Sequence, residues 1–187
     1  MTQQNGNHLN KSFQKIKGKI GEHLIKELFE NLGYDVEFTG VEYRTPAYAN
    51  LVKRNKDFKI FKTMSYFPDF YMYSKEKNKP FLVEVKFRQN GKLLVNEIFQ
   101  YHEDETIIIV ISPDSFACNR IGDLKNKFQS SKDKKDCYIE PENFVPLQDF
   151  KEFGFNKEEK NTISDYIKMA NVFFEGLNGL YPKLKKE

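Results

Sequence analysis

The stretch that decides the fold is residues 80–89, PFLVEVKFRQ, in which apolar and charged side chains alternate. Successive side chains of a β-strand point to opposite faces of the sheet, so this alternation predicts a strand with two different faces. One face is apolar and is expected to join the core; it carries Phe81, Val83, Val85 and Phe87. The other face carries Glu84 and Lys86, an acid and an amine that need partners from elsewhere in the chain.

The segment before this strand predicts its neighbour in the sheet. Residues 69–73, DFYMY, are separated from it by the polar loop 74–79, which indicates an antiparallel β-hairpin. This loop length places Asp69 opposite Glu84, with Cβ atoms about 4.5–5.5 Å apart. Two carboxylates so close are destabilising unless one takes a proton or a cation lies between them. Lys86 supplies one positive charge, but Mg²⁺ is better suited because it prefers carboxylate oxygens and waters.

Hydrophobic periodicity elsewhere predicts helices around a central sheet. Apolar residues recur at helical spacing over residues 12–31 and again over 158–177. We also expect a helix at 91–104, strands at 34–38 and 105–112, and one or two short late strands at 137–140 and 143–147. The segment 105–112, ETIIIVIS, contains a continuous apolar run, which is typical of a strand buried on both faces. The order of these elements predicts an α/β fold with a central mixed β-sheet flanked by helices.

The whole chain, residues 1–187, is expected to form a single domain with three peripheral segments. Residues 1–11 are predicted to be a flexible N-terminal extension, and residues 181–187 a solvated tail. Residues 40–67 are expected to form a basic insertion that mixes aromatic side chains with lysines and arginines. The insertion is either a loop or a loop around a short strand at 58–62.

Composition excludes several classes of protein. Hydrophobic residues make up 39% of the chain and charged residues 30%, which favours a globular protein over a disordered one. No apolar run approaches the roughly 20 residues that cross a bilayer, and the N-terminal residues lack a signal-peptide pattern. A cytoplasmic protein without membrane contact is therefore expected. Cys118 and Cys137 have no CxxC spacing and are predicted to be free thiols rather than zinc ligands.

The charged residues of the hairpin resemble a known motif. Pro68-Asp69 followed by Glu84-Val85-Lys86 is similar to the motif of the PD-(D/E)XK nuclease superfamily, and the order of elements over residues 15–112 is similar as well. That family usually adds a glutamate from the helix that precedes the sheet. The stretch GKIGEHLIKELFENLGY offers Glu22 at the edge of the apolar stripe, with Glu27 and Glu30 as rival acids. The resemblance implies a restriction-endonuclease-like core.

The resemblance also implies a function, a Mg²⁺-dependent nuclease that hydrolyses phosphodiester bonds. The expected substrate is DNA, cut by an endonuclease that is structure-selective or weakly sequence-specific. Asp69, Glu84 and the backbone carbonyl of Val85 would bind Mg²⁺, and Mn²⁺ is expected to substitute for it. Lys86 would orient or deprotonate the attacking water or stabilise the transition state, and Glu22 would assist this metal or a second one.

Contacts to nucleic acid are expected from basic and polar side chains around this site. Lysine and arginine bind phosphates, so the contacts predicted from charge are Arg44, Lys53, Arg54, Lys56 and Arg88. The resemblance adds Gln100 as a further predicted contact. Gln100 and Tyr101 also resemble polar residues that some relatives place near the substrate. His23 is expected on the polar face of its helix, and His102 is not expected to bind a metal with the acids that follow it.

Several alternatives stay open at this point. The chain could be a catalytically inactive nucleic-acid-binding or assembly module of the same fold, or an endonuclease that acts on RNA. The charged hairpin residues could also form an ordinary surface ion pair. Many relatives act as dimers, so a homodimer is among the expected states, and Phe173, Phe174 and Leu177 of the last helix would serve either an interface or the core.

Overall fold

The computed structural model of the chain describes residues 2–39, 67–101, 103–134 and 136–184, with side chains only between 10 and 179. Within these residues a mixed sheet of six strands forms the centre, in the order β1-β2-β3-β5-β6-β8. Strands β3 and β5 run parallel, and every other neighbouring pair of this sheet is antiparallel. The strands are β1 Tyr34–Phe38, β2 Phe70–Ser74, β3 Lys79–Phe87, β5 Ile107–Ser112, β6 Ser115–Arg120 and β8 Val145–Pro146.

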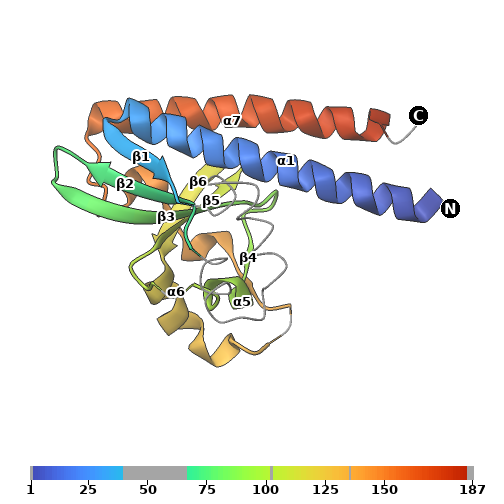
Figure 1. The fold of residues 1–187 in the computed structure, drawn as a ribbon, viewed down its shortest axis with the longest axis horizontal. Helices are drawn as coiled ribbons and strands as arrows, with labels where there is room; N and C mark the ends of the chain where they lie inside the picture. Colours follow the sequence, from blue (N-terminus) through green and yellow to red (C-terminus); the bar gives the residue numbers. More distant parts are fainter. Residues whose placement is uncertain (1, 40–66, 102, 135, 185–187) are drawn as a thin grey trace.

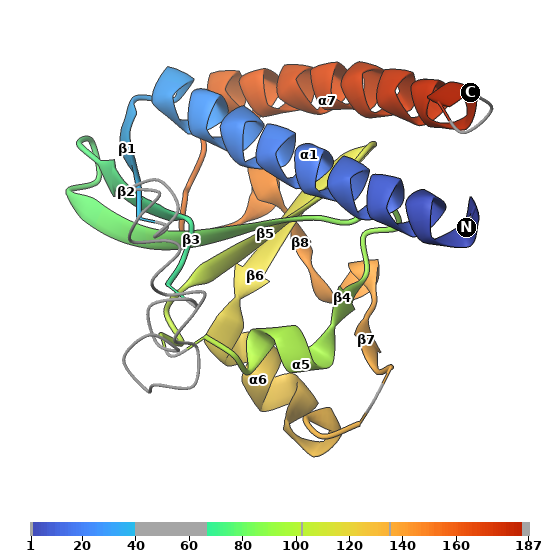
Figure 2. The same ribbon diagram turned by 45° about the vertical axis from the view of Figure 1, so that its right-hand side comes forward.

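Helices cover both faces of this sheet (Figures 1 and 2). On one face, α1 (Thr2–Asn31) and α7 (Lys157–Leu184) lie side by side. On the other face lie α5 (Val95–Ile98) and α6 (Ile121–Phe128), next to a small sheet of β4 (Leu93–Leu94) and β7 (Tyr138–Ile139). Short 3-10 helices lie at Gln129–Ser131, Pro141–Asn143 and Leu147–Asp149. The predicted α/β class, a mixed sheet flanked by helices, is confirmed.

Two apolar clusters pack the sheet against its helices. The first lies between the sheet and the α1–α7 pair and includes Phe29 and Phe174, both fully buried. The second lies between the sheet and the α5–α6 side and includes Ile98. Strand β5 contributes to both clusters, since Ile109 joins the first and Ile108 the second. All six residues of β5 are buried, as its continuous apolar run predicted.

The two long helices extend further than their periodicity predicted. Helix α1 begins at Thr2, so the segment expected to be a flexible extension is helical, and α7 continues to Leu184, into the expected tail. Both helices run past the edge of the sheet at these ends (Figure 1). Periodicity reports the face that a helix buries against a core, so it does not mark turns that lie beyond the core.

The helix predicted at 91–104 is wrong. Leu93 and Leu94 form β4, which pairs with β7, and the helix α5 spans only Val95–Ile98. The backbone N–H of Val95 donates to the carbonyl of Cys137 at 2.9 Å, which ties this segment to a distant one. Its apolar residues are buried because they line the second cluster from a strand and a single helical turn. In the sequence, that spacing resembles a longer helix.

Other parts of the fold bear on the remaining predictions. Strand β6 and helix α6 were not predicted, whereas the short late strands are confirmed as β7 and β8. Cys118 and Cys137 are free thiols, as expected. Among the described residues, none of the helices has the length and hydropathy of a membrane-spanning segment. The short strand predicted at 58–62 lies outside the described residues.

Candidate functional site

The hairpin has the register that the loop length predicted. Phe70 is paired with Val83, and Ser74 with Lys79. Asp69 directly precedes β2, so it lies where the ladder ends, level with Glu84. There its carboxylate replaces a ladder partner, because Oδ2 accepts a hydrogen bond of 2.9 Å from the backbone N–H of Val85. Strand β3 continues past this point to Phe87 without β2 beside it.

Thr39 holds the Pro68-Asp69 pair in place from the end of β1. Its backbone N–H donates to the carbonyl of Asp69 at 2.9 Å, and its hydroxyl donates to the carbonyl of Pro68. Pro68 is buried, and β1 and β2 remain paired up to Phe38 and Phe70. Asp69 is therefore held by two strands, with its backbone carbonyl bonded at the end of β1 and its carboxylate bonded to β3. Thr39 is a positioning residue that the sequence analysis missed, since its partners lie about thirty residues away.

Glu84 is a buried acid with two donors on one oxygen. Its side chain points to the α5–α6 side of the sheet, and the residue is only 4% exposed. The hydroxyl of Tyr101 donates to Oε1 at 2.6 Å, and the ammonium of Lys86 donates to the same atom. Lys86 also lies over the Tyr101 ring, 5.9 Å from its centroid. Glu84, Lys86 and Tyr101 therefore form one hydrogen-bonded group rather than an ordinary surface ion pair.

The electrostatics of Asp69 reflect its crowded position. Burial raises the pKa of the Asp69 carboxyl well above the ordinary value of 3.8, and the charges of Glu84 and Glu22 raise it further. The ammonium of Lys86 and the N–H of Val85 act in the opposite direction. The four predicted catalytic residues thus lie within electrostatic range of one another. An added cation would favour the charged form of Asp69.

Lys86 and Tyr101 respond to the same acids. Burial is the largest effect on the pKa of Lys86 and lowers it. The charge of Glu84, its hydrogen bond to Lys86 and the neighbouring acidic groups together outweigh burial, so the net pKa lies above the ordinary value. Burial and the charge of Glu84 both raise the pKa of the Tyr101 hydroxyl. At neutral pH, Lys86 is therefore a cation and Tyr101 a neutral hydrogen-bond donor.

Glu22 acts electrostatically on Asp69 from α1. Its side chain is 12% exposed and forms an ion pair of 2.7 Å with Lys19. The preceding residue, Gly21, permits the close approach of the helix, since a Cβ there would lie 3.2 Å from Cδ1 of Ile111. Of the rival acids, Glu30 is exposed and pairs with Lys26, and Glu27 lines a groove between α1 and α7.

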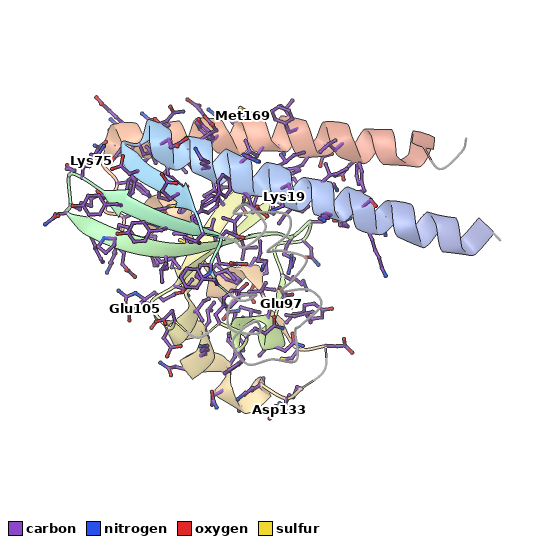
Figure 3. The ribbon with its side chains drawn as sticks, in the orientation of Figure 1. Lys19, Lys75, Glu97, Glu105, Asp133 and Met169 are labelled. Carbon is purple, nitrogen blue, oxygen red and sulfur yellow. The ribbon has the colours of Figure 1, made fainter. Side chains whose placement is uncertain are left out.

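The predicted nucleic-acid contacts fare differently. Arg88 forms an ion pair with Glu97 on α5, which Figure 3 shows on the opposite side of the sheet from Lys19. Its guanidinium also donates to the carbonyl of Phe87 at 2.8 Å, so much of its hydrogen-bonding capacity is already used. Gln100 is exposed just beyond α5. The other predicted contacts lie outside the described residues: Arg44, Lys53, Arg54 and Lys56.

The two histidines near the site give no metal ligand within the described residues. His23 is exposed on α1, as expected, and its ring makes an edge contact with Phe38 at 5.5 Å between centroids. His102 lies outside the described residues. No group of three or more His, Cys, Asp or Glu side chains that could hold a metal ion is found in the described part of the chain.

The oxygen atoms present nevertheless fit Mg²⁺. In the described part of the chain, the hydrogen bonds to Asp69 and Glu84 occupy Oδ2 and Oε1, which leaves Oδ1 and Oε2 as ligand atoms. The N–H and C=O of a strand residue point to the same neighbour, so the Val85 carbonyl is directed to the same side as Asp69. Two carboxylates and one carbonyl suit a small hard cation that keeps several waters. Glu22 is not a third side-chain ligand in this arrangement.

Comparisons with known proteins do not identify this site, so its function is inferred from its own residues. No family model, no curated protein and no solved structure matches the chain.

Proposed function

We propose that this protein is a Mg²⁺-dependent endonuclease with a restriction-endonuclease-like core, and that it hydrolyses phosphodiester bonds in DNA. The observation that carries the proposal is the crowding of Asp69, which directly precedes β2 and lies level with Glu84, with Glu22 in electrostatic range. A core position that served only packing would be filled at lower cost by an apolar side chain, since buried carboxylates that repel one another destabilise the fold. A divalent cation bound between these carboxylates would offset their repulsion, which accounts for their placement.

The residues of the site have distinct roles in this proposal. Asp69, Glu84 and the carbonyl of Val85 would hold Mg²⁺, which supplies a Lewis acid that stabilises charge on the scissile phosphate. Lys86 orients the attacking water and stabilises the developing negative charge. It is a poor general base, because its pKa is raised by the neighbouring carboxylates. Tyr101 positions Glu84, and Glu22 supports the site from α1.

The expected homodimer is part of the proposal. A groove of about 690 Å³ runs between α1 and α7 on the side away from the sheet, where Figure 3 shows Met169. Its lining includes Ile16 and Phe173, which are 51% and 52% exposed, whereas Phe174 packs in the core. Lys15 and Glu27 also line the groove, twelve residues apart along α1. A second copy of the chain, packed antiparallel here, would place unlike charges opposite each other.

A cleavage assay tests the enzyme proposal. Labelled single-stranded, duplex and branched DNA, together with RNA, are incubated with Mg²⁺, Mn²⁺ or EDTA. We expect metal-dependent cutting of DNA that falls by about 100-fold or more in Asp69→Asn and Lys86→Ala, since both groups act on the reacting atoms. The matched controls are Asp165→Asn and Lys168→Ala, which alter an exposed ion pair on α7 and should leave activity unchanged.

Two other results would contradict the proposal. Cutting of RNA alone would make the protein an RNA endonuclease. No cutting of any substrate, with salt-sensitive binding that survives both substitutions, would favour a binding module that retains the fold.

A further inference from the structure

Lys17 is a buried cation that the proposed active site does not use. It lies on α1, is 3% exposed, and donates to the amide oxygens of Asn178 at 2.6 Å and Gln89 at 3.3 Å. Its ammonium also lies over the rings of Phe13 and Phe87, at 5.1 and 5.4 Å from their centroids. None of the described carboxylates forms an ion pair with it. A buried ammonium with no carboxylate in direct contact is costly, which favours either loss of its proton or binding of an anion.

The amide groups around Lys17 are oriented as hydrogen-bond donors. An ammonium group can only donate, so the oxygens of Gln89 and Asn178 must face Lys17. Their NH₂ groups consequently point elsewhere, and neither has an acceptor among the described residues. One of the three N–H groups of Lys17 is also left after these two bonds. Burial lowers the pKa of Lys17, and the charge of Glu175 acts against this effect.

These donors line a cavity of about 330 Å³ between α1, α7 and the end of β3. Its lining consists of Asn10, Phe13, Gln14, Lys17, Gln89 and Asn178. Among the described residues, the lining contains one cation, four side-chain amides and no carboxylate, so it is suited to an anion and not to a metal ion. The volume is at the lower end of the range for small-molecule sites.

The cavity also has a defined position relative to the acidic site. Lys17 precedes Glu22 by five residues, about 7.5 Å along the helix. Gln89 follows Lys86 by three residues, which span at most about 10 Å because β3 ends at Phe87. The cavity lies on the α1–α7 side of the sheet, beyond Phe87 at the end of β3, whereas the side chain of Glu84 points to the α5–α6 side.

We propose that the Lys17 cavity binds a phosphate group. The phosphate belongs either to a nucleic-acid strand that continues to the acidic site or to a free nucleotide. The first source rests on the proposed nuclease function, whereas phosphate binding itself does not.

Binding of inorganic phosphate without metal is the first test. We expect phosphate to raise the Tm of the wild type in a saturable way, and expect Lys17→Met to lose this response. Lys11→Met, an exposed lysine of the same helix, should keep it. Absence of a saturable response in the wild type, or an equal response in Lys17→Met, would overturn the proposal.

A second variant guards against misfolding of Lys17→Met. Asn178→Asp is nearly isosteric and gives Lys17 an internal carboxylate partner. We expect it to raise the Tm without phosphate and to abolish the phosphate response. A response that survives in a folded Asn178→Asp variant would contradict a site at Lys17.

A third measurement separates the two sources of phosphate. Binding of a labelled oligonucleotide and of a deoxynucleoside monophosphate is compared in an Asp69→Asn background, which blocks cleavage. Oligonucleotide binding that weakens by about ten-fold on Lys17→Met supports the nucleic-acid backbone. Unchanged oligonucleotide binding, with loss of monophosphate binding, supports a free nucleotide. Because neither readout needs cleavage, failure of the nuclease proposal would leave this result interpretable.

Discussion

Among the residues of the site, Tyr101 contacts Glu84 from the second core cluster. Its side chain is 7% exposed, its hydroxyl donates to Glu84, and its own carbonyl accepts from Lys125 at 2.8 Å. The tyrosine is therefore fixed at both its backbone and its hydroxyl. Packing on the α5–α6 side of the sheet therefore helps to fix the position of Glu84, a carboxylate of the proposed metal site.

Removing this hydroxyl should lower catalysis without unfolding the protein. In Tyr101→Phe, a hydrogen bond to a charged group is lost, which is worth about 1.5–3 kcal/mol. We expect kcat to fall by roughly ten- to a hundred-fold, with little change in KM, in steady-state cleavage assays. Tyr71→Phe is the control, since Tyr71 is 42% exposed. An equal loss of activity in both variants would argue against this role for Tyr101.

The raised pKa of Asp69 predicts an unusual dependence of stability on pH. The folded state holds the proton of Asp69 more tightly than the unfolded state, whose pKa is near 3.8. The stability contributed by the protonated acid is therefore lost as the pH rises from that value through the folded pKa. In metal-free protein, Asp69→Asn should raise the Tm at pH 7 by a few degrees, and the gain should vanish near pH 3.

Mg²⁺ provides the complementary measurement on the same residue. A ligand that binds only the folded state stabilises it by mass action. Mg²⁺ should thus raise the Tm of the wild type and not that of Asp69→Asn. A similar Mg²⁺ effect on both proteins would place the cation elsewhere.

The predictability of single residues follows the range of their contacts. The shared strand face of Glu84 and Lys86 could be predicted from alternation. The position of Asp69 opposite Glu84 could be predicted from the length of one loop. Thr39 could not, because its role depends on strands that meet across a long segment. Lys17 also could not, since a lysine among polar helix residues gives no sign of burial until α7 packs against it.

Helix α1 is the element that joins the proposed sites. Two of its glycines, Gly18 and Gly21, differ in their surroundings. A Cβ at Gly18 would meet nothing within 4 Å, whereas one at Gly21 would lie 3.2 Å from Ile111 and 3.9 Å from Phe87. Close packing at Gly21 fixes the height of Glu22 above the sheet.

This difference predicts opposite effects of matched substitutions. Gly18→Ala should stabilise the protein by about 0.5–1 kcal/mol, the usual gain for alanine in a helix interior. Gly21→Ala should gain less, and Gly21→Val should lower both the Tm and the cleavage rate because α1 must move away from Ile111 of β5 and Phe87 of β3. Thermal unfolding and cleavage assays measure both effects. A Gly21→Val protein of unchanged stability and activity would show that the approach of α1 is not needed.

Elements were predictable where one pattern ran long enough. The hairpin, β1 and β5 each follow a clear apolar pattern, and they form the four adjacent strands of the sheet that surround Asp69 and Glu84. The prediction failed over β4 and α5, where a strand and one helical turn share a cluster. Packing of distant segments, rather than local propensity, decides such short elements.

At the scale of the whole molecule, the groove between α1 and α7 predicts the oligomeric state. Exposed apolar residues concentrated between two helices favour burial against a second copy. Sedimentation of the wild type should show a dimer, and Phe173→Asp should give a monomer of similar Tm. Val172→Asp is the control, because Val172 is 74% exposed but does not line the groove. A wild type that is monomeric at all concentrations would contradict the prediction.

The buried thiol of β6 gives the molecule an internal reporter of opening. Cys118 is fully buried between Ile109 of β5 and Val145 of β8, and burial raises the pKa of its thiol. A thiol reagent can therefore modify Cys118 only during transient exposure of the sheet. In a Cys137→Ser background, the rate at which Cys118 is labelled reports how often the sheet opens. Any ligand that binds the folded state should lower this labelling rate.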